Sequence, residues 1–244
     1  MHHFFVTPEN VSDGEITITG SDVNHIKNVL RMRIGEELLI SNGQGQDYLC
    51  KLKNLADDMV TCEITDAEFE GCESPAKFYL FQGLPKADKF ETVIQKAVEL
   101  GAFEIVPVET KRTIVKLDAK KKEAKIKRWN SIAESAAKQS RRSIVPEVAD
   151  VLKFDKALEM AKDFDLNIIP YENFKDMEAT RAALSNVKPG MKVGIFIGPE
   201  GGFDEAEVDA AIEAGVKPIS LGKRILRTET AGLTILSILM FMLE

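Results

Sequence analysis

The stretch IFIGPEGGFDEAEV, residues 195–208, has the pattern of a buried strand, a glycine turn and a helix. Turns of this kind usually bind phosphate, because free backbone N–H groups and the helix dipole favour an anion. Glu200 lies inside the turn, and a carboxylate there opposes phosphate binding. The chain also has no GxxxxGK[ST] motif, and the turn lacks GxGxxG spacing. We therefore expect a ligand other than a polyphosphate.

The organisation of the 244-residue chain changes near residues 74 and 75, which predicts two domains. Residues 1–74 contain short strands separated by Gly, Asn and Asp turns, which indicates a small β-barrel. Its expected strands are Phe4–Val6, Ile16–Thr19, Glu37–Ser41, Tyr48–Leu52 and Met59–Ile64, with one helix N-capped by Ser21. Residues 75–244 alternate strand and helix, which is typical of an α/β domain with a parallel sheet covered on both faces. Its expected strands are Phe78–Phe81, Phe103–Val108, Leu166–Ile169, Val193–Ile197 and Pro218–Leu221.

Three strand ends in the second domain carry unusual sequences: IIPYEN (168–173), GPEGG (198–202) and LGKRILRTETA (221–231). Ligands of open α/β sheets bind at the carboxyl ends of strands. Asp204 and Glu207 have the spacing of a helix capping box, so helix initiation explains part of this pattern. Capping does not explain Glu200, Arg227 or Glu229. Turns rich in glycine and proline would let the backbone approach a flat ligand such as adenine.

Charge is distributed unevenly along the chain, whose net charge is −7. Residues 111–142 contain twelve Lys or Arg and three Asp or Glu, a net charge of +9 that leaves −16 for the rest. A solvated helix surface is one interpretation, and a docking face for RNA is the other. Trp129 and Gln139 lie among these basic residues and favour RNA. Candidate RNA contacts are Lys111, Arg112, Arg128, Gln139, Arg141 and Arg142, with Arg31 and Arg33 in the first domain.

Other features argue against metal and membrane sites. The three cysteines, Cys50, Cys62 and Cys72, form no CxxC pair, which suits reduced thiols in a cytoplasmic protein. His2 and His3 are either possible ligands or the remnant of a purification tag, and neither interpretation implies a structural metal centre. The longest apolar run, Ala231–Leu243, is too short to span a bilayer. No secretory signal is visible.

The motifs together resemble a known family. GPEGGF followed by LGKRILRTETA, with KRTIVK, RWNSIAESAAKQSRR, HHFFV and HIKNVLRMRIG, is similar to the bacterial 16S rRNA (uracil-N3)-methyltransferases. This family belongs to the SPOUT class of S-adenosylmethionine-dependent enzymes. The resemblance covers almost the whole chain. It implies a PUA-like N-terminal barrel, a C-terminal domain with a deep trefoil knot, and a homodimer in which the barrel of one subunit serves the cofactor pocket of the other. The apolar helix Thr228–Leu243 would then be partly covered by the partner.

The resemblance also implies a site. The cofactor would be bound by Pro170, Tyr171, Gly198, Glu200, Gly201, Leu221, Gly222, Ile225, Leu226 and Arg227. Because uracil N3 carries a proton, methyl transfer needs a base as well as positioning. We expect Arg227 to position the uracil and stabilise charge on its oxygen, with Glu200 as a candidate base; an internal salt bridge is the alternative role. The implied substrate is 16S rRNA or the small ribosomal subunit. A SPOUT ribose 2′-O-methyltransferase and a non-catalytic RNA-binding assembly factor are the competing hypotheses.

Overall fold

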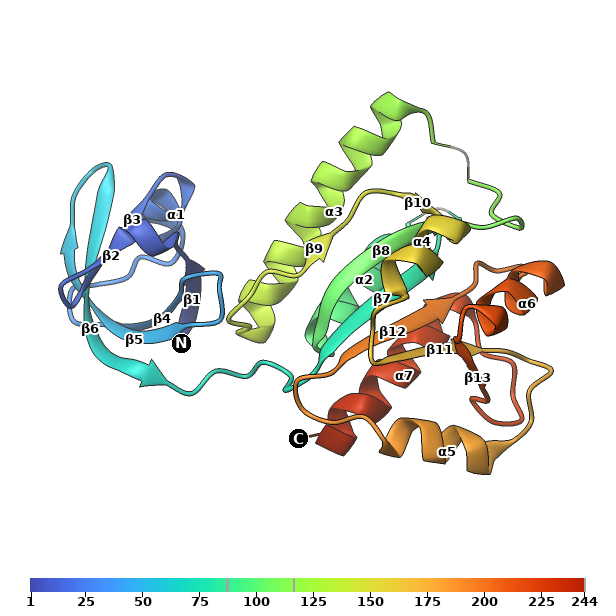
Figure 1. The fold of residues 1–244 in the computed structure, drawn as a ribbon. Helices are drawn as coiled ribbons and strands as arrows, with labels where there is room; N and C mark the ends of the chain where they lie inside the picture. The colour runs from blue at the N-terminus through green and yellow to red at the C-terminus, as the bar shows by residue number, and fades with distance from the viewer. Residues whose placement is uncertain (87, 116, 244) are drawn as a thin grey trace. The chain divides into compact units, whose positions relative to one another are not determined.

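The computed structural model describes residues 1–86, 88–115 and 117–243, which fold into two compact units (Figure 1). The first unit comprises Met1–Glu73 together with Ala137–Val145. The second comprises Ser74–Ala136 and Pro146–Glu244. A segment from the middle of the chain therefore belongs to the N-terminal unit, a feature that the sequence analysis did not include.

The first unit is a curled six-stranded sheet. Its strands, in spatial order, are β1 (His2–Phe5), β4 (Glu37–Ser41), β5 (Asp47–Leu55), β6 (Met59–Phe69), β3 (Glu15–Thr19) and β2 (Val11–Ser12). Only the β1–β4 pair is parallel. The short helices are η1 (Pro8–Asn10), α1 (Ser21–Asn24) and the π-helical η2 (His25–Val29). All five predicted strands are confirmed, but Ser21 is the first helical residue, and Gly20, with φ of 72°, takes the N-cap position instead.

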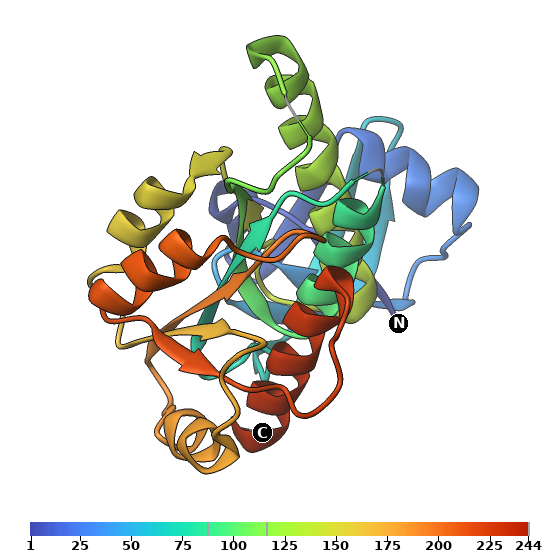
Figure 2. The ribbon, with the colours of Figure 1, turned by 90° about the vertical axis from the view of Figure 1, so that its right-hand side faces the viewer.

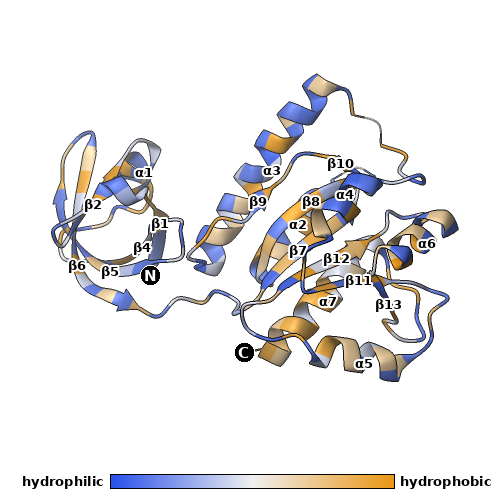
Figure 3. Ribbon diagram, viewed as in Figure 1, coloured by the Kyte–Doolittle hydropathy of each residue, from blue (hydrophilic) through white to orange (hydrophobic). Residues whose placement is uncertain are grey.

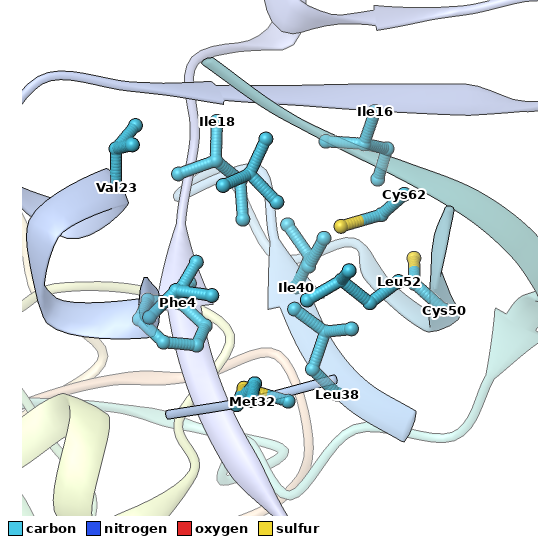
Figure 4. Packing of buried hydrophobic residues seen from close by; sticks show 12 residues of the cluster. Phe4, Ile16, Ile18, Val23, Met32, Leu38, Ile40, Cys50, Leu52 and Cys62 are labelled. Carbon is cyan, nitrogen blue, oxygen red and sulfur yellow. The ribbon is translucent and has the colours of Figure 1, made fainter. Parts of the chain in front are cut away.

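Alternating side chains of these strands form the core of the first unit. Figure 4 shows Phe4 from β1, Ile16 and Ile18 from β3, and Leu38 and Ile40 from β4 pointing toward one another. Each of these five side chains is almost completely buried. The period of two in a strand explains why alternate residues of each segment meet on the inner face.

Segment 137–145 is attached to the first unit by buried polar contacts. Asp47 accepts hydrogen bonds from the hydroxyls of Ser41 and Ser143, the latter at 2.6 Å. The Arg142 guanidinium forms an ion pair with Glu73, with a closest approach of 2.5 Å. His3 pairs with Ser41 at 2.6 Å, so this histidine is built into the fold. We call this group of residues, His3, Ser41, Asp47 and Ser143, the Asp47 network.

The second unit is built on a parallel sheet, as the sequence predicts. Its path runs β10 (Leu152–Lys153), β8 (Ala102–Glu109), β7 (Lys77–Gly83), β12 (Lys192–Ile197), β11 (Leu166–Pro170) and β13 (Lys217–Ile219), and β9 (Glu147–Val148) also pairs with β8. The five predicted strands are all present, within one or two residues at most ends. β7, β12, β11 and β13 are neighbours along this path, so their carboxyl ends meet at one edge.

Helices cover both faces of this sheet (Figure 2). One face carries α2 (Lys89–Glu99) and α7 (Thr228–Leu243), and the other carries α4 (Phe154–Ala161) and α6 (Glu205–Glu213). α5 (Met177–Ser185) packs near β13, and α3 (Ala119–Ser140) is the basic helix. The apolar stripe of α2, including Phe90 and Val98, is buried, and Gly101 follows the helix with φ of 84°, which is typical of a C′ residue.

Hydropathy distinguishes α3 from α7 (Figure 3). α3 is mostly hydrophilic, whereas α7 is apolar along most of its length. Only part of α7 is buried by its own unit: Leu236 is completely buried, but Phe241 is 85% exposed. Within the described residues, no helix combines the length and the apolar character that a membrane span requires.

Candidate active site

A cavity of about 750 Å³ lies at the carboxyl edge of the parallel sheet. This volume is within the roughly 300–1,000 Å³ that small-molecule sites occupy. The turns after β11, β12 and β13 line it, joined by the start of α2 and by Arg112. Of the residues predicted to bind cofactor, the lining includes Pro170, Tyr171, Gly198, Glu200, Gly201, Leu221, Ile225, Leu226 and Arg227. Gly222, with φ of 99°, lies in the turn after β13 but is not among the residues that line the cavity.

Two glycines shape the GPEGG turn. A Cβ on Gly198 would lie 3.0 Å from the backbone of Gly202 and Phe203. A Cβ on Gly83, at the end of β7, would lie 2.6 Å from Pro199. Gly201 is different, because a Cβ there would meet only the side chain of Arg112, at 3.4 Å. The close approach of backbone to backbone therefore depends on Gly83 and Gly198 rather than on Gly201.

A buried hydrogen-bond chain links three separate segments of the site. The Thr228 hydroxyl donates to the Gly198 carbonyl at 2.6 Å and accepts from the Gln82 amide at 2.8 Å. Gln82 is completely buried in β7, and its amide also donates to the Gly83 carbonyl at 3.0 Å. Thr228, the first residue of α7, thus ties the start of this helix to the GPEGG turn. The sequence alone does not identify Gln82 as a residue of the site. The only local indication is a polar residue followed by glycine at the end of a strand.

Lys89 lies between the two carboxylates that the sequence singles out. Its ammonium nitrogen is 3.4 Å from Oε1 of Glu200 and 3.5 Å from Oε2 of Glu229. The backbone N–H of Lys86 also donates to Oε1 of Glu200 at 3.0 Å. Partial burial of Glu200 opposes its ionisation, but the backbone N–H groups of Glu200 and Lys86 and the Lys89 ammonium outweigh burial and hold its pKa below the usual value. Glu200 is therefore an ionised, anchored group at neutral pH.

Two residues predicted to bind RNA contact the GPEGG turn and the following helix. The Lys111 ammonium lies 2.8 Å from Asp204, and its backbone N–H donates to Glu207 at 2.7 Å. Arg112 donates to the Gly201 carbonyl at 3.0 Å. Asp204 and Glu207 form the predicted capping box of α6. The hydrogen bond from Lys111 is the main cause that lowers the pKa of Asp204. These contacts join residues 111 and 112, which follow β8, to the GPEGG turn and to the start of α6.

The other basic candidates differ in exposure. Arg31, Arg33, Gln139 and Arg141 are exposed, and Arg31 and Arg141 have left-handed backbones, with φ of 53° and 60°. Arg128 is exposed but pairs with Glu91 through two hydrogen bonds, at 2.6 and 2.7 Å. Arg142 is only 3% exposed, and its pairing with Glu73 gives it a structural role in the first unit.

The thiols and histidines form no centre of their own in the described residues, where no cluster of His, Cys, Asp and Glu is arranged to hold a metal. Cys50 and Cys62 are buried in the core of the first unit, and burial raises the pKa of each thiol to about 12.

The cavity chemistry fits S-adenosylmethionine. That molecule carries a sulfonium, an ammonium and a carboxylate besides adenosine. The cavity offers side chains of both signs, with the carboxylates Glu172, Glu200 and Glu229 and the cations Lys89, Arg112, Lys175, Arg224 and Arg227. The glycine-shaped turn also exposes backbone groups, which can read the edge of an adenine.

Comparison with known proteins agrees with this geometry. An RNA methyltransferase domain model matches residues 72–240, and an RNA methyltransferase PUA domain model matches residues 18–65. A Bacillus subtilis protein named ribosomal RNA small subunit methyltransferase E is 39% identical, over 100% of this chain and 98% of its own. A Neisseria gonorrhoeae protein of that name, solved bound to S-adenosylmethionine, is 33% identical with a TM-score of 0.83, covering 98% of this chain and 96% of its own. A putative Legionella pneumophila methyltransferase, solved with the same cofactor, is 31% identical with a TM-score of 0.83, covering 97% and 96%. The chain therefore belongs to the ribosomal RNA small subunit methyltransferase E family.

Proposed function

We propose that this protein transfers a methyl group from S-adenosylmethionine to N3 of one uridine in the 16S rRNA of the small ribosomal subunit. The observation that carries the proposal is the cavity at the carboxyl edge of the sheet, where nine of the ten residues predicted to bind cofactor line one space. Family relatives named for rRNA methylation, and the cofactor bound to one of them, support the same activity. The substrate implies a cytoplasmic protein.

The chain's residues would divide the work of binding and positioning. The cofactor, when bound, supplies an electrophilic methyl group on sulfur. The turns at 170–171, 198–201 and 221–227 would hold it, with Gly198 allowing close backbone approach. Arg227 would position the uracil edge and stabilise negative charge on its oxygen. N3 lies on the Watson–Crick edge, so the target uridine must be unpaired or extruded from its helix.

RNA would bind mainly through exposed basic and amide side chains. Arg31, Arg33, Gln139 and Arg141 are exposed, and all four belong to the first unit. Phosphate contacts by arginine supply affinity that falls with salt. Lys111, Arg112 and Arg128 are also partly exposed but are paired with acidic or backbone groups of the second unit, so they would contact RNA while holding those partners. Arg142 would act indirectly, by fixing the backbone beside Arg141.

A homodimer with a trefoil knot in each second unit is part of the proposal. The exposed apolar end of α7, at Ile238, Phe241 and Met242, is a surface that a partner would cover. A cavity of about 340 Å³, lined by residues of α5 and α7, adjoins it. If the barrel of one subunit serves the pocket of the other, a Gly198 variant and an Arg31/Arg33 double variant, each inactive alone, should recover activity after subunit exchange. Mixed dimers without methyl transfer would disprove the shared site, and a monomer by sedimentation would disprove the dimer.

The experiment that tests the function maps the modified atom. Ribosomal RNA from cells with and without the gene is digested, and nucleosides are identified by mass spectrometry. A 3-methyluridine that depends on the gene supports the proposal. A gene-dependent ribose methylation would favour the 2′-O-methyltransferase. No change in methylation, together with no binding of S-adenosylmethionine by calorimetry, would favour a non-catalytic assembly factor.

A further inference from the structure

Uracil N3 must lose its proton during methyl transfer, so the site needs an acceptor beside the cofactor. The cavity contains three carboxylates, Glu172, Glu200 and Glu229. Glu172 is exposed and lies in the turn after β11. The choice therefore rests on the contacts of Glu200 and Glu229.

Glu200 is held by a backbone donor and a cation from its surroundings. Its Oε1 accepts the Lys86 backbone N–H at 3.0 Å and lies 3.4 Å from the Lys89 ammonium. A carboxylate whose charge is stabilised by several donors is a weaker proton acceptor. The contacts of Glu200 thus suit an anchor for the GPEGG turn better than a base.

Glu229 has fewer donors and a fixed position. Within the described residues its Oε2 is buried and accepts no hydrogen bond; its only close cation is Lys89, at 3.5 Å. The side chain is still 24% exposed, and Glu229 is one of the residues that line the cavity. The preceding residue, Thr228, is held by Gln82 and by the Gly198 carbonyl, which fixes the backbone from which Glu229 projects.

We infer that Glu229 is the group that accepts the N3 proton of the target uracil, while Glu200 and Lys89 hold the turn and the orientation of Glu229. This inference rests on the proposed function. The N3–H bond breaks with its electron pair left on nitrogen, and its proton passes to the Glu229 carboxylate. N3 forms a bond to the methyl carbon as the carbon–sulfur bond breaks, with that electron pair left on sulfur to give a neutral thioether. Glu229 then returns its proton to solvent.

The test compares Glu229→Gln with Glu200→Gln. Both replacements keep the size of the side chain and remove the charge. Single-turnover methylation is measured on an in vitro transcript that the wild type accepts, made either with uridine or with 5-fluorouridine, whose fluorine lowers the pKa of N3. Binding of S-adenosylmethionine is measured by calorimetry in parallel.

For Glu229→Gln we expect a rate about 10²–10⁴-fold below that of the wild type, the range typical of a lost general base. Cofactor affinity should stay within about threefold, because a base toward uracil contributes little to cofactor binding. The rate should recover at high pH, and the variant should gain more from 5-fluorouridine than the wild type does, because the base is needed less. Glu200→Gln should lose cofactor affinity and show no such selective recovery.

Three results would overturn the assignment: a Glu229→Gln rate within tenfold of wild type, a loss that 5-fluorouridine does not selectively repair, or a loss explained by cofactor affinity. If Glu229→Gln does not fold by circular dichroism, Glu229→Asp decides, since it keeps a carboxylate and should retain measurable rate with the pH dependence of the wild type. If the wild type itself makes no 3-methyluridine, the proposed function fails, and that outcome is distinct from the failure of Glu229 as base.

Discussion

The hydroxyl of Thr228 is a single group on which the geometry of the cavity depends. It donates to the Gly198 carbonyl and accepts from the buried Gln82 amide. Removing the hydroxyl takes one acceptor from the completely buried Gln82 amide, and an unsatisfied buried polar group costs about 1–3 kcal/mol. One side chain thus couples the start of α7 to the turn that holds the proposed cofactor.

Thr228→Val should therefore lower the free energy of unfolding by about 1–3 kcal/mol and weaken S-adenosylmethionine binding by about tenfold, since each 1.4 kcal/mol is tenfold. Thr228→Ser is the matched control, because it keeps the hydroxyl and should remain close to wild type. Urea denaturation and calorimetry supply the two measurements. Equal affinities for the Val and Ser variants would show that the hydroxyl does not position the turn.

Alanine substitutions at the two glycines Gly198 and Gly201 of the GPEGG turn should differ sharply in their effect on cofactor affinity. Gly198→Ala forces a Cβ to within 3.0 Å of backbone atoms, which must shift. Gly201→Ala meets only the flexible side chain of Arg112. We expect Gly198→Ala to lower cofactor affinity at least tenfold and Gly201→Ala to change it less than threefold, by calorimetry. A larger loss for Gly201→Ala would mean that the cofactor approaches the backbone at residue 201.

Single residues also show what the sequence can and cannot predict. The capping box of Asp204 and Glu207 could be predicted because both members lie three residues apart in one helix start. The position of Gln82 could not, because its partner Thr228 is 146 residues away. Arg142 illustrates the same limit: its charge suggests RNA, but its partner Glu73 is distant in sequence, and pairing buries it.

At the scale of elements, periodicity predicted the strands and helices well. Five of the seven strands of the parallel sheet and the buried stripe of α2 follow from apolar patterns that repeat over whole segments, whereas the two-residue strands β9 and β10 are too short to show such a pattern. The assignment of residues 137–145 to the first unit does not follow from any local pattern. α3 looks like one amphipathic helix in sequence, yet its last turn belongs to a different compact unit from the rest.

The Asp47 network should hold that last turn and the following loop in place. Asp47 is 2% exposed and accepts from Ser41 and Ser143. Ser143→Ala removes one donor from a buried carboxylate and should destabilise the first unit by about 1–3 kcal/mol. Ser135→Ala is the matched control, because the exposed Ser135 hydroxyl donates to the Ser131 carbonyl within α3, at 2.9 Å, and has no part in the Asp47 network. Limited proteolysis near residue 145 should be faster for Ser143→Ala, and equal rates would contradict the attachment.

At the scale of the whole molecule, acid should weaken the fold through His3. Burial lowers the pKa of His3 below its usual 6.5, and this effect outweighs the negative charge of Asp47, which raises the pKa. The positive charges of Lys138 and Arg141 lower it further, while a hydrogen bond with the Lys138 backbone raises it. The unfolded chain therefore binds a proton at a higher pH than the folded chain does. The stability that neutral His3 contributes is fully present above about pH 6.5. As the pH decreases from there toward the pKa of folded His3, the free energy of unfolding falls by at most about 1.4 kcal/mol per pH unit for one proton.

His3→Gln should flatten that dependence. Glutamine can still pair with Ser41 but cannot titrate, so the variant should lose less stability than the wild type between pH 7 and pH 5.5. Urea denaturation at several pH values measures both. His2, which lies next to it and is exposed, is the matched control position, and His2→Gln should keep the wild-type slope. Identical slopes for His3→Gln and wild type would show that His3 is not the titrating group.

Folding during synthesis follows a constraint set by segment 137–145. The residues of the N-terminal sheet are synthesised first. Asp47 cannot pair with Ser143, nor Glu73 with Arg142, until more than half of the chain has been synthesised. A fragment that stops at residue 73 would leave two carboxylates without those partners. An autonomous N-terminal fragment should therefore be made by joining residues 1–73 to 137–145 through a short linker, not by truncation alone.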